Sequence, residues 1–91
     1  MAWQINYTNT ALKQLGKFDK PAAKRIVDYM DERIGTAINP RESGKALTGA
    51  LLGGYWRYRV GDYRVICDIQ DNVLWILVIE VGSRKDVYTQ H

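Results

Sequence analysis

Three closely spaced arginines form the strongest candidate for a functional site in this sequence. Arg57, Arg59 and Arg64 lie on either side of Gly61-Asp62, a two-residue pair typical of the loop that closes a tight β-hairpin. Such a loop pairs Arg59 with Arg64, and the alternation of side chains along a strand puts all three arginines on one face. Like charges directly opposite each other destabilise a hairpin by up to about 1 kcal/mol. The pattern therefore predicts an anionic ligand, and the planar donor fork of arginine favours phosphate.

The opposite face of the same hairpin is apolar, which is typical of a strand pair that packs on a core. The single cysteine, Cys67, falls on this face. We expect it to be a small buried hydrophobe, because the only histidine that could activate a thiol is the distant His91. One cysteine allows no disulfide within the chain, which fits a reducing cytoplasm. The apolar face consists of Trp56, Tyr58, Val60, Tyr63, Val65, Cys67 and Ile69.

Two further candidates, Arg84 and Tyr88, follow the last apolar run of the sequence. We expect Gly82 to end the preceding strand and let the chain turn, so that both side chains could fold back towards the three arginines. No Cys/His metal set, phosphate-binding glycine loop, catalytic carboxylate pair or Ser-His-Asp set is visible. The chemistry that remains is what guanidinium groups and a phenol can support.

Cleavage of an RNA phosphodiester by its own 2′-OH is one such reaction. The enzyme supplies no nucleophile and needs no metal; it aligns the attack, neutralises the developing charge and moves two protons. Arginines provide the neutralisation, and a phenol among guanidinium groups becomes a more accessible general base. A guanidinium is a poor proton donor, so the leaving-group step lacks an obvious acid.

Each candidate also has a purely structural explanation. A single strand arginine is commonly solvated or salt-bridged, and Asp68 shares the face of Arg64. Glu80 or Asp86 would neutralise Arg84, and a lone tyrosine late in a chain commonly packs against its neighbours. The arginines taken together, however, favour a functional role.

The elements that position these residues predict a single α+β domain over residues 1–91. Helices should pack on one face of a largely antiparallel sheet, with the arginines on the other face. The third strand of the closing meander, VLWILVIEV, is apolar on both faces and should be central. We expect a strand at 3–7, a short helix capped by Thr8 or Thr10 and ending near Leu15, a helix from Asp19 to about Ile34, a loop over 35–54, and strands at about 55–60, 63–70 and 73–81, the last two joined at Asp71-Asn72.

Composition predicts no membrane-spanning segment. The net charge is +3, and the longest apolar run, Val73 to Ile79, is far shorter than the roughly 20 residues that span a bilayer. The N-terminus has no basic region followed by an apolar run, so it does not read as a secretory signal. We expect a soluble, cytoplasmic protein with no membrane partner.

Nearly the whole chain resembles the RelE/ParE superfamily of bacterial toxin–antitoxin toxins, and most of all its RelE branch. The resemblance rests on the strand and two-helix start, on KALTG, and on GYWRYRVGDYRV with the closing VGSRKDVY. It implies a ribosome-dependent endoribonuclease that cleaves mRNA in the A site without a cofactor. It also implies a RelB-like antitoxin that blocks the toxin, and operator DNA as an indirect partner through the antitoxin complex.

The resemblance also assigns roles to individual positions. It makes Arg64, Arg84 and Tyr88 the catalytic residues: Arg64 stabilises the phosphate, Arg84 lies near the leaving group, and Tyr88 takes part in proton transfer or base stacking. It makes Arg57, Arg59 and Lys45 the RNA- and phosphate-binding residues. Two other functions remain open: a ParE-like toxin that poisons DNA gyrase without chemistry of its own, and an inactive relative that serves as a binding module or corepressor.

Overall fold

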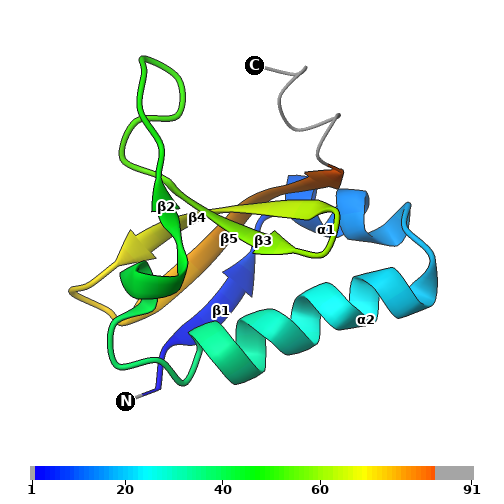
Figure 1. Ribbon diagram of the computed structural model, residues 1–91, viewed down its shortest axis with the longest axis horizontal. Helices are drawn as coiled ribbons and strands as arrows, with labels where there is room; N and C mark the ends of the chain where they lie inside the picture. Colours follow the sequence, from blue (N-terminus) through cyan, green and yellow to red (C-terminus); the bar gives the residue numbers. More distant parts are fainter. Residues whose placement is uncertain (1, 84–91) are drawn as a thin grey trace.

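The structure, a computed structural model, describes residues 2–83, which form two α-helices packed against one five-stranded sheet (Figure 1). The strands lie in the order β1-β5-β4-β3-β2; β1 is parallel to β5, and the other neighbours are antiparallel. The α+β prediction, with its three-stranded antiparallel meander, is confirmed. No helix within these residues is long and apolar enough to cross a membrane. The strands are β1 (Gln4–Tyr7), β2 (Lys45–Ala46), β3 (Trp56–Val60), β4 (Tyr63–Gln70) and β5 (Trp75–Ser83).

Both helices begin where the sequence predicts. Thr8 caps α1 (Asn9–Gly16) by accepting a hydrogen bond from the Ala11 N–H at 3.1 Å. Asp19 precedes α2 (Lys20–Tyr29), although its side chain makes no capping bond. The helix then continues as one π-helical turn, η1 (Met30–Ile34), in which the Gly35 N–H donates to the Met30 carbonyl at 2.7 Å. The predicted end near Ile34 is therefore right, but the last turn is wider than an α-helix.

The prediction of an unstructured loop over residues 35–54 is wrong in part. Pro40–Ser43 form a 3₁₀ turn, η2, and Lys45–Ala46 form the short strand β2 on the edge of the sheet. Arg41 holds this segment in place by donating two hydrogen bonds to the Asp71 carboxylate, at 2.9 and 2.6 Å, while its guanidinium lies over the Trp56 ring. These contacts join residues far apart in sequence, which is why local composition did not reveal them.

The core lies between the helices and one face of the sheet. Tyr58, Val65 and Cys67 of the predicted apolar face are fully buried there. Ile26 and Met30 reach the same cluster from the second helix, and Phe18 packs its ring on Tyr63 with the centroids 4.7 Å apart. The remaining buried members of the cluster are Trp3, Ala11, Leu15, Ile34, Val60, Ile69, Ile76, Val78 and Val81.

The interior strand β5, which lies between β1 and β4, contains a bulge that changes which of its side chains face the core. Cys67 is opposite Val78, whereas the preceding residue Ile66 is opposite Glu80, so Ile79 is an extra residue in β5. Strict alternation from Val78 would send Glu80 into the core. The extra residue instead buries Val81, at 1% exposure, and puts Glu80 on the arginine side of the sheet.

Residues of the first helix and its cap hold this bulge. The Thr8 N–H donates to the Val78 carbonyl at 3.0 Å, and the Thr8 hydroxyl donates to the Ile79 carbonyl at 3.0 Å. The Val81 N–H, which lies past the end of β1, donates to the Gln14 Oε1 at 2.6 Å. A backbone donor that β1 does not reach is thereby satisfied by a side chain.

Two other sequence expectations about β5 are wrong. The strand runs to Ser83, and Gly82 is paired with Arg64 inside it and does not end it. The connection from β4 is longer than the Asp71-Asn72 turn, because β5 begins only at Trp75 and Leu74 adopts a positive φ of 55°. Glycine weakens a strand but does not have to end it, and the pairing with Arg64 keeps Gly82 in the ladder.

We expect Gln14→Ala to destabilise the protein by about 1–2 kcal/mol, because it leaves the buried Val81 N–H without an acceptor. Urea unfolding measures the loss, and amide hydrogen exchange should show faster exchange at Val81. Gln4→Ala is the matched control, because the Gln4 side chain is exposed and bonds only Asn6 among the described residues. Equal destabilisation by the two substitutions would contradict the role given to Gln14.

Candidate phosphate-binding face

The hairpin register agrees with the sequence prediction at every pair that it named. Val60 is opposite Tyr63, Arg59 opposite Arg64, and Tyr58 opposite Val65. Gly61 opens the two-residue loop with a φ of 59°, a left-handed conformation that glycine adopts without strain. Arg59 and Arg64 are therefore direct cross-strand neighbours on the face that does not pack on the helices.

The three arginines differ in how deeply they lie. Arg59 is exposed and Arg57 is half-buried, whereas Arg64 is only 5% exposed. The Nε of Arg64 is itself buried and donates to no acceptor within the described part of the chain. A buried, charged donor without an acceptor is costly, and an anionic oxygen placed against it would remove that cost. Arg64 thus offers a buried donor that an anion could satisfy, and the exposed Arg59 lies directly opposite it.

The short strand β2 adds a fourth cation to this face. Lys45 is opposite Arg57, so both side chains belong to the same cross-strand row, and Lys45 is exposed. We call Lys45, Arg57, Arg59 and Arg64 the basic face. The sequence named Lys45, but its position in a strand beside Arg57 depends on the β2–β3 pairing that the sequence analysis missed.

A carboxylate on the same side of the sheet was not recognised as a site residue from the sequence. Glu80 is opposite Ile66, two residues along the ladder from the Arg64–Gly82 pair, and Ile66 in turn is opposite Arg57. The row across the sheet therefore runs from Lys45 through Arg57 and Ile66 to Glu80. Sequence alternation alone puts Glu80 on the wrong face, because the bulge is not visible as a residue pattern.

Two side chains of the hairpin, the Tyr58 phenol and the Cys67 thiol, are removed from chemistry by burial. The Tyr58 hydroxyl donates to the Pro40 carbonyl at 2.6 Å, and burial raises the pKa of this phenol above its ordinary value. Burial likewise raises the pKa of the Cys67 thiol, so that its reactive thiolate form is disfavoured. This agrees with the expectation that Cys67 is a small buried hydrophobe.

The other two predicted catalytic residues, Arg84 and Tyr88, lie outside the described residues. Ser83, the last described residue, is opposite Tyr63 at the hairpin end of β5. Their roles therefore stay predictions. Within residues 2–83, no group of three or more His, Cys, Asp and Glu side chains is arranged to hold a metal ion.

Solved structures with the same fold are toxins, although they are too distant in sequence to show more than the fold. A chain of the RelBE2 toxin–antitoxin complex of Mycobacterium tuberculosis superposes with a TM-score of 0.84 at 24% identity, over 94% of this chain and 95% of that one. A chain of the Pyrococcus horikoshii RelE–RelB complex gives 0.74 at 24%, over 94% and 99%. An E. coli RelE mutant in complex with an antitoxin RelBc peptide gives 0.69 at 22%, over 99% and 94%.

Sequence comparison supplies the family. A search of curated proteins found no match. The family model described as the ParE toxin of type II toxin–antitoxin systems, parDE, matches residues 5–88, which is nearly the whole chain. With the RelE-like fold and the basic face described above, this match shows that the chain belongs to the RelE/ParE superfamily and is a toxin of the type II toxin–antitoxin class.

Proposed function

We propose that this toxin is a ribosome-dependent endoribonuclease that cleaves mRNA in the A site and so inhibits translation. The observation that carries the proposal is the direct pairing of Arg59 with the buried Arg64. A sheet tolerates two guanidinium groups in direct opposition most readily when an anion lies between them. A phosphodiester is such an anion, and the surrounding basic face would bind the RNA strand on either side of it.

Attack by the ribose 2′-OH on its own phosphate fits a site of this kind. The bond from the 2′-oxygen to phosphorus forms as the bond to the 5′-oxygen breaks, leaving a cyclic phosphate and a free 5′-hydroxyl. Arg64 would neutralise the charge that builds up on the phosphate oxygens, and Arg57, Arg59 and Lys45 would hold the strand. Arg84 is proposed to lie near the leaving oxygen. The protein supplies no nucleophile and no metal.

The two protons of this reaction need an acceptor and a donor. We assign the acceptor role to Glu80, because it is the carboxylate that the β5 bulge brings into the row of Arg57, beside the Arg64 pair. A carboxylate takes the 2′-OH proton more readily than a guanidinium does. Tyr88 is then available to donate a proton to the departing 5′-oxygen, the step for which the sequence offered no acid.

The partners of the proposed activity are the ribosome with its mRNA, in the cytoplasm, and a RelB-like antitoxin. Support for the antitoxin comes from the toxin family itself and from related folds solved with RelB-type chains. Operator DNA would be reached indirectly, through the antitoxin complex.

The first test is primer extension on an mRNA translated in a purified system. We expect new 5′ ends within ribosome-occupied codons, and none when ribosomes are omitted. Arg64→Ala should lower the cleavage rate by about 10²–10³-fold, since it removes one preorganised charge from the transition state. Arg64→Lys keeps the positive charge but loses the two-pronged donor of the guanidinium, so its cleavage rate should lie between those of the wild type and Arg64→Ala. Thermal unfolding of each variant checks that the fold persists.

An intact message under these conditions would overturn the nuclease proposal. The second candidate, inhibition of DNA gyrase, has one observation in its favour, which is that the matching family model describes ParE toxins. A supercoiling assay with the same protein preparation tests it directly. A gyrase inhibitor would block supercoiling and leave the translated message uncut.

The role of Glu80 predicts a large loss of activity from one substitution. Glu80→Gln removes the proton acceptor and should lower the single-turnover cleavage rate by about 10²–10⁴-fold. Within residues 2–83, the charged side chains on the same face of the sheet as Glu80 are Arg64 and Asp68 on β4, Arg57 and Arg59 on β3, and Lys45 on β2.

Asp68→Asn is the matched control, because Asp68 lies on the same face and accepts a hydrogen bond from Gln70 at 3.0 Å. It should cleave close to the wild-type rate. A Glu80→Gln variant that cleaves as fast as Asp68→Asn would show that Glu80 is not the proton acceptor.

A further inference from the structure

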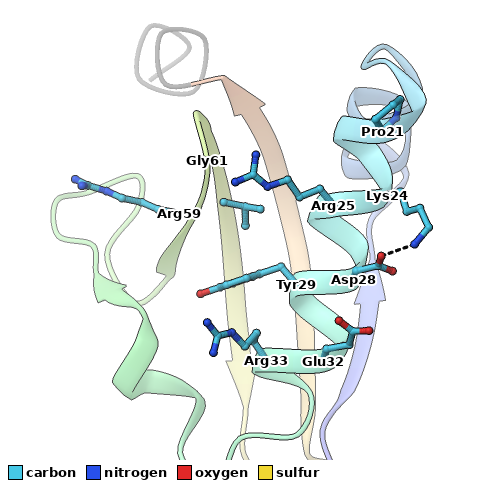
Figure 2. A pocket seen from close by; sticks show the side chains of 10 residues that line it. Pro21, Lys24, Arg25, Asp28, Tyr29, Glu32, Arg33, Arg59 and Gly61 are labelled. Atoms are coloured by element: carbon cyan, nitrogen blue, oxygen red, sulfur yellow. Dashed lines mark hydrogen bonds and ion pairs between the residues drawn. The ribbon is translucent and has the colours of Figure 1, made fainter.

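The side of the sheet that carries the basic face continues towards the opposite end of the strands. In Figure 2 the Arg59 side chain points away from α2, so it projects on the side that the helices do not cover. Ile69 and Ile76 are buried in the core, on the helix side. Because side chains alternate along a strand, their chain neighbours Gln70 and Trp75 lie on the open side, together with Arg59.

A tryptophan lies between two glutamines on this open side. Trp75 on β5 is opposite Gln4 on β1 and opposite Gln70 on β4, so the three residues form one row across three strands. We call them the Gln–Trp–Gln row. Trp75 is 40% exposed, whereas the other two tryptophans of the chain are buried or half-buried. At about 4.8 Å between strands, the two glutamine Cα atoms stand roughly 10 Å apart, with Trp75 midway between them.

The glutamine amides on either side of the indole are held in place but not used up. Each amide donates one N–H to a polar side chain two residues away on its own strand, at 3.3 Å for Gln4 and 3.0 Å for Gln70. Neither amide carbonyl accepts a hydrogen bond from the described residues. Each amide therefore presents an acceptor and a second N–H donor side by side, and this pair complements the N6 and N7 edge of adenine.

We propose that the Gln–Trp–Gln row is a base-binding subsite that makes mRNA cleavage sequence-selective. A base of the bound strand stacks on the Trp75 indole, and the amides of Gln4 and Gln70 bond to its edge, so that adenine is preferred. The inference rests on the proposed function in taking single-stranded mRNA as the ligand. It adds to that function the residues that choose where the message is cut.

The row lies along the path of an RNA strand bound at the basic face. Gln70 is four residues along β4 from Ile66, whose row contains Arg57 and Lys45. Four strand residues span about 13 Å, so the recognised base belongs to a nucleotide a few positions from the cleaved phosphate. The row itself contains no charged residue, which suits a base, while the cations of the basic face suit the phosphates.

A base fits the row better than a protein side chain does. A docked protein would cover the indole with apolar groups, but the residues beside the indole across the sheet are amides. Covering those amides without pairing their free groups is costly. A base satisfies both requirements at once, because it has an aromatic face for stacking and a polar edge for the amides.

The first test measures binding of 2′-O-methyl oligoadenylate and oligouridylate, which cannot undergo 2′-OH attack, by quenching of tryptophan fluorescence. We expect oligoadenylate to bind more tightly and to quench the exposed indole. Trp75→Ala should lose this quench and raise the Kd by about 10-fold, and Trp75→Phe, which keeps an aromatic ring, should bind with an intermediate Kd. Leu12→Ala is the matched control, because it shortens an exposed apolar side chain on α1 and should change neither quantity.

The glutamines are tested through base preference and not through affinity alone. Gln4→Ala combined with Gln70→Ala leaves the indole for stacking, so it should bind oligouridylate as the wild type does and lose about 10-fold of the preference for oligoadenylate. In the translated system, primer extension should show that this double variant keeps the wild-type maximal cleavage rate but no longer favours sites with adenine at the recognised position. Thermal unfolding of each variant checks that the fold persists.

The outcomes separate the subsite from the nuclease. A quench and Kd that are unchanged in Trp75→Ala, or an adenine preference that survives the double glutamine substitution, would overturn the subsite. Normal RNA binding by Trp75→Ala with weakened binding of the antitoxin would also overturn it and assign the row to a protein partner. A wild-type protein that binds oligoadenylate through Trp75 but cuts no translated message would refute only the nuclease.

Discussion

One bulge in strand β5 determines which side chains lie on each face of the sheet. Without the bulge at Ile79, the alternation that buries Ile76 and Val78 would carry the Glu80 carboxylate into the apolar core, where it would have to be protonated or paired. With it, Val81 completes the core and Glu80 joins the basic side. The extra residue is held by Thr8 and Gln14, from the first helix and its cap. The cap that starts α1 thus also fixes the alternation of a strand about seventy residues later.

The hairpin then divides the cations of the protein between two surfaces. Its flat side carries three arginines, and one of them, Arg64, is buried with a donor that finds no acceptor among the described residues. Its edge runs beside a helix that contributes two more arginines around a tyrosine. A single short strand, β3, separates the two surfaces.

Short sequence patterns were sufficient to predict the features that depend on neighbouring residues, namely the hairpin register and the helix starts. Gly61-Asp62 gave the hairpin register because the turn itself sets it, and Thr8 and Asp19 gave the helix starts because capping involves neighbouring residues. The bulge, the strand at Lys45–Ala46 and the clamp between Arg41 and Asp71 depend on contacts between distant segments. No spacing rule within one segment reveals them. The same limit hid Glu80 as a candidate site residue.

The position of β5 has a consequence for how the protein is made. This strand is synthesised after every other strand of the sheet, yet it lies between β1 and β4. A nascent chain can close the β3–β4 hairpin early, because that contact is local, but the first strand has no neighbour to pair with until β5 emerges. The core therefore cannot assemble on a partly made chain. A chain interrupted before β5 would lack Glu80 and the strand that joins β1 to β4, so incomplete translation yields no folded toxin.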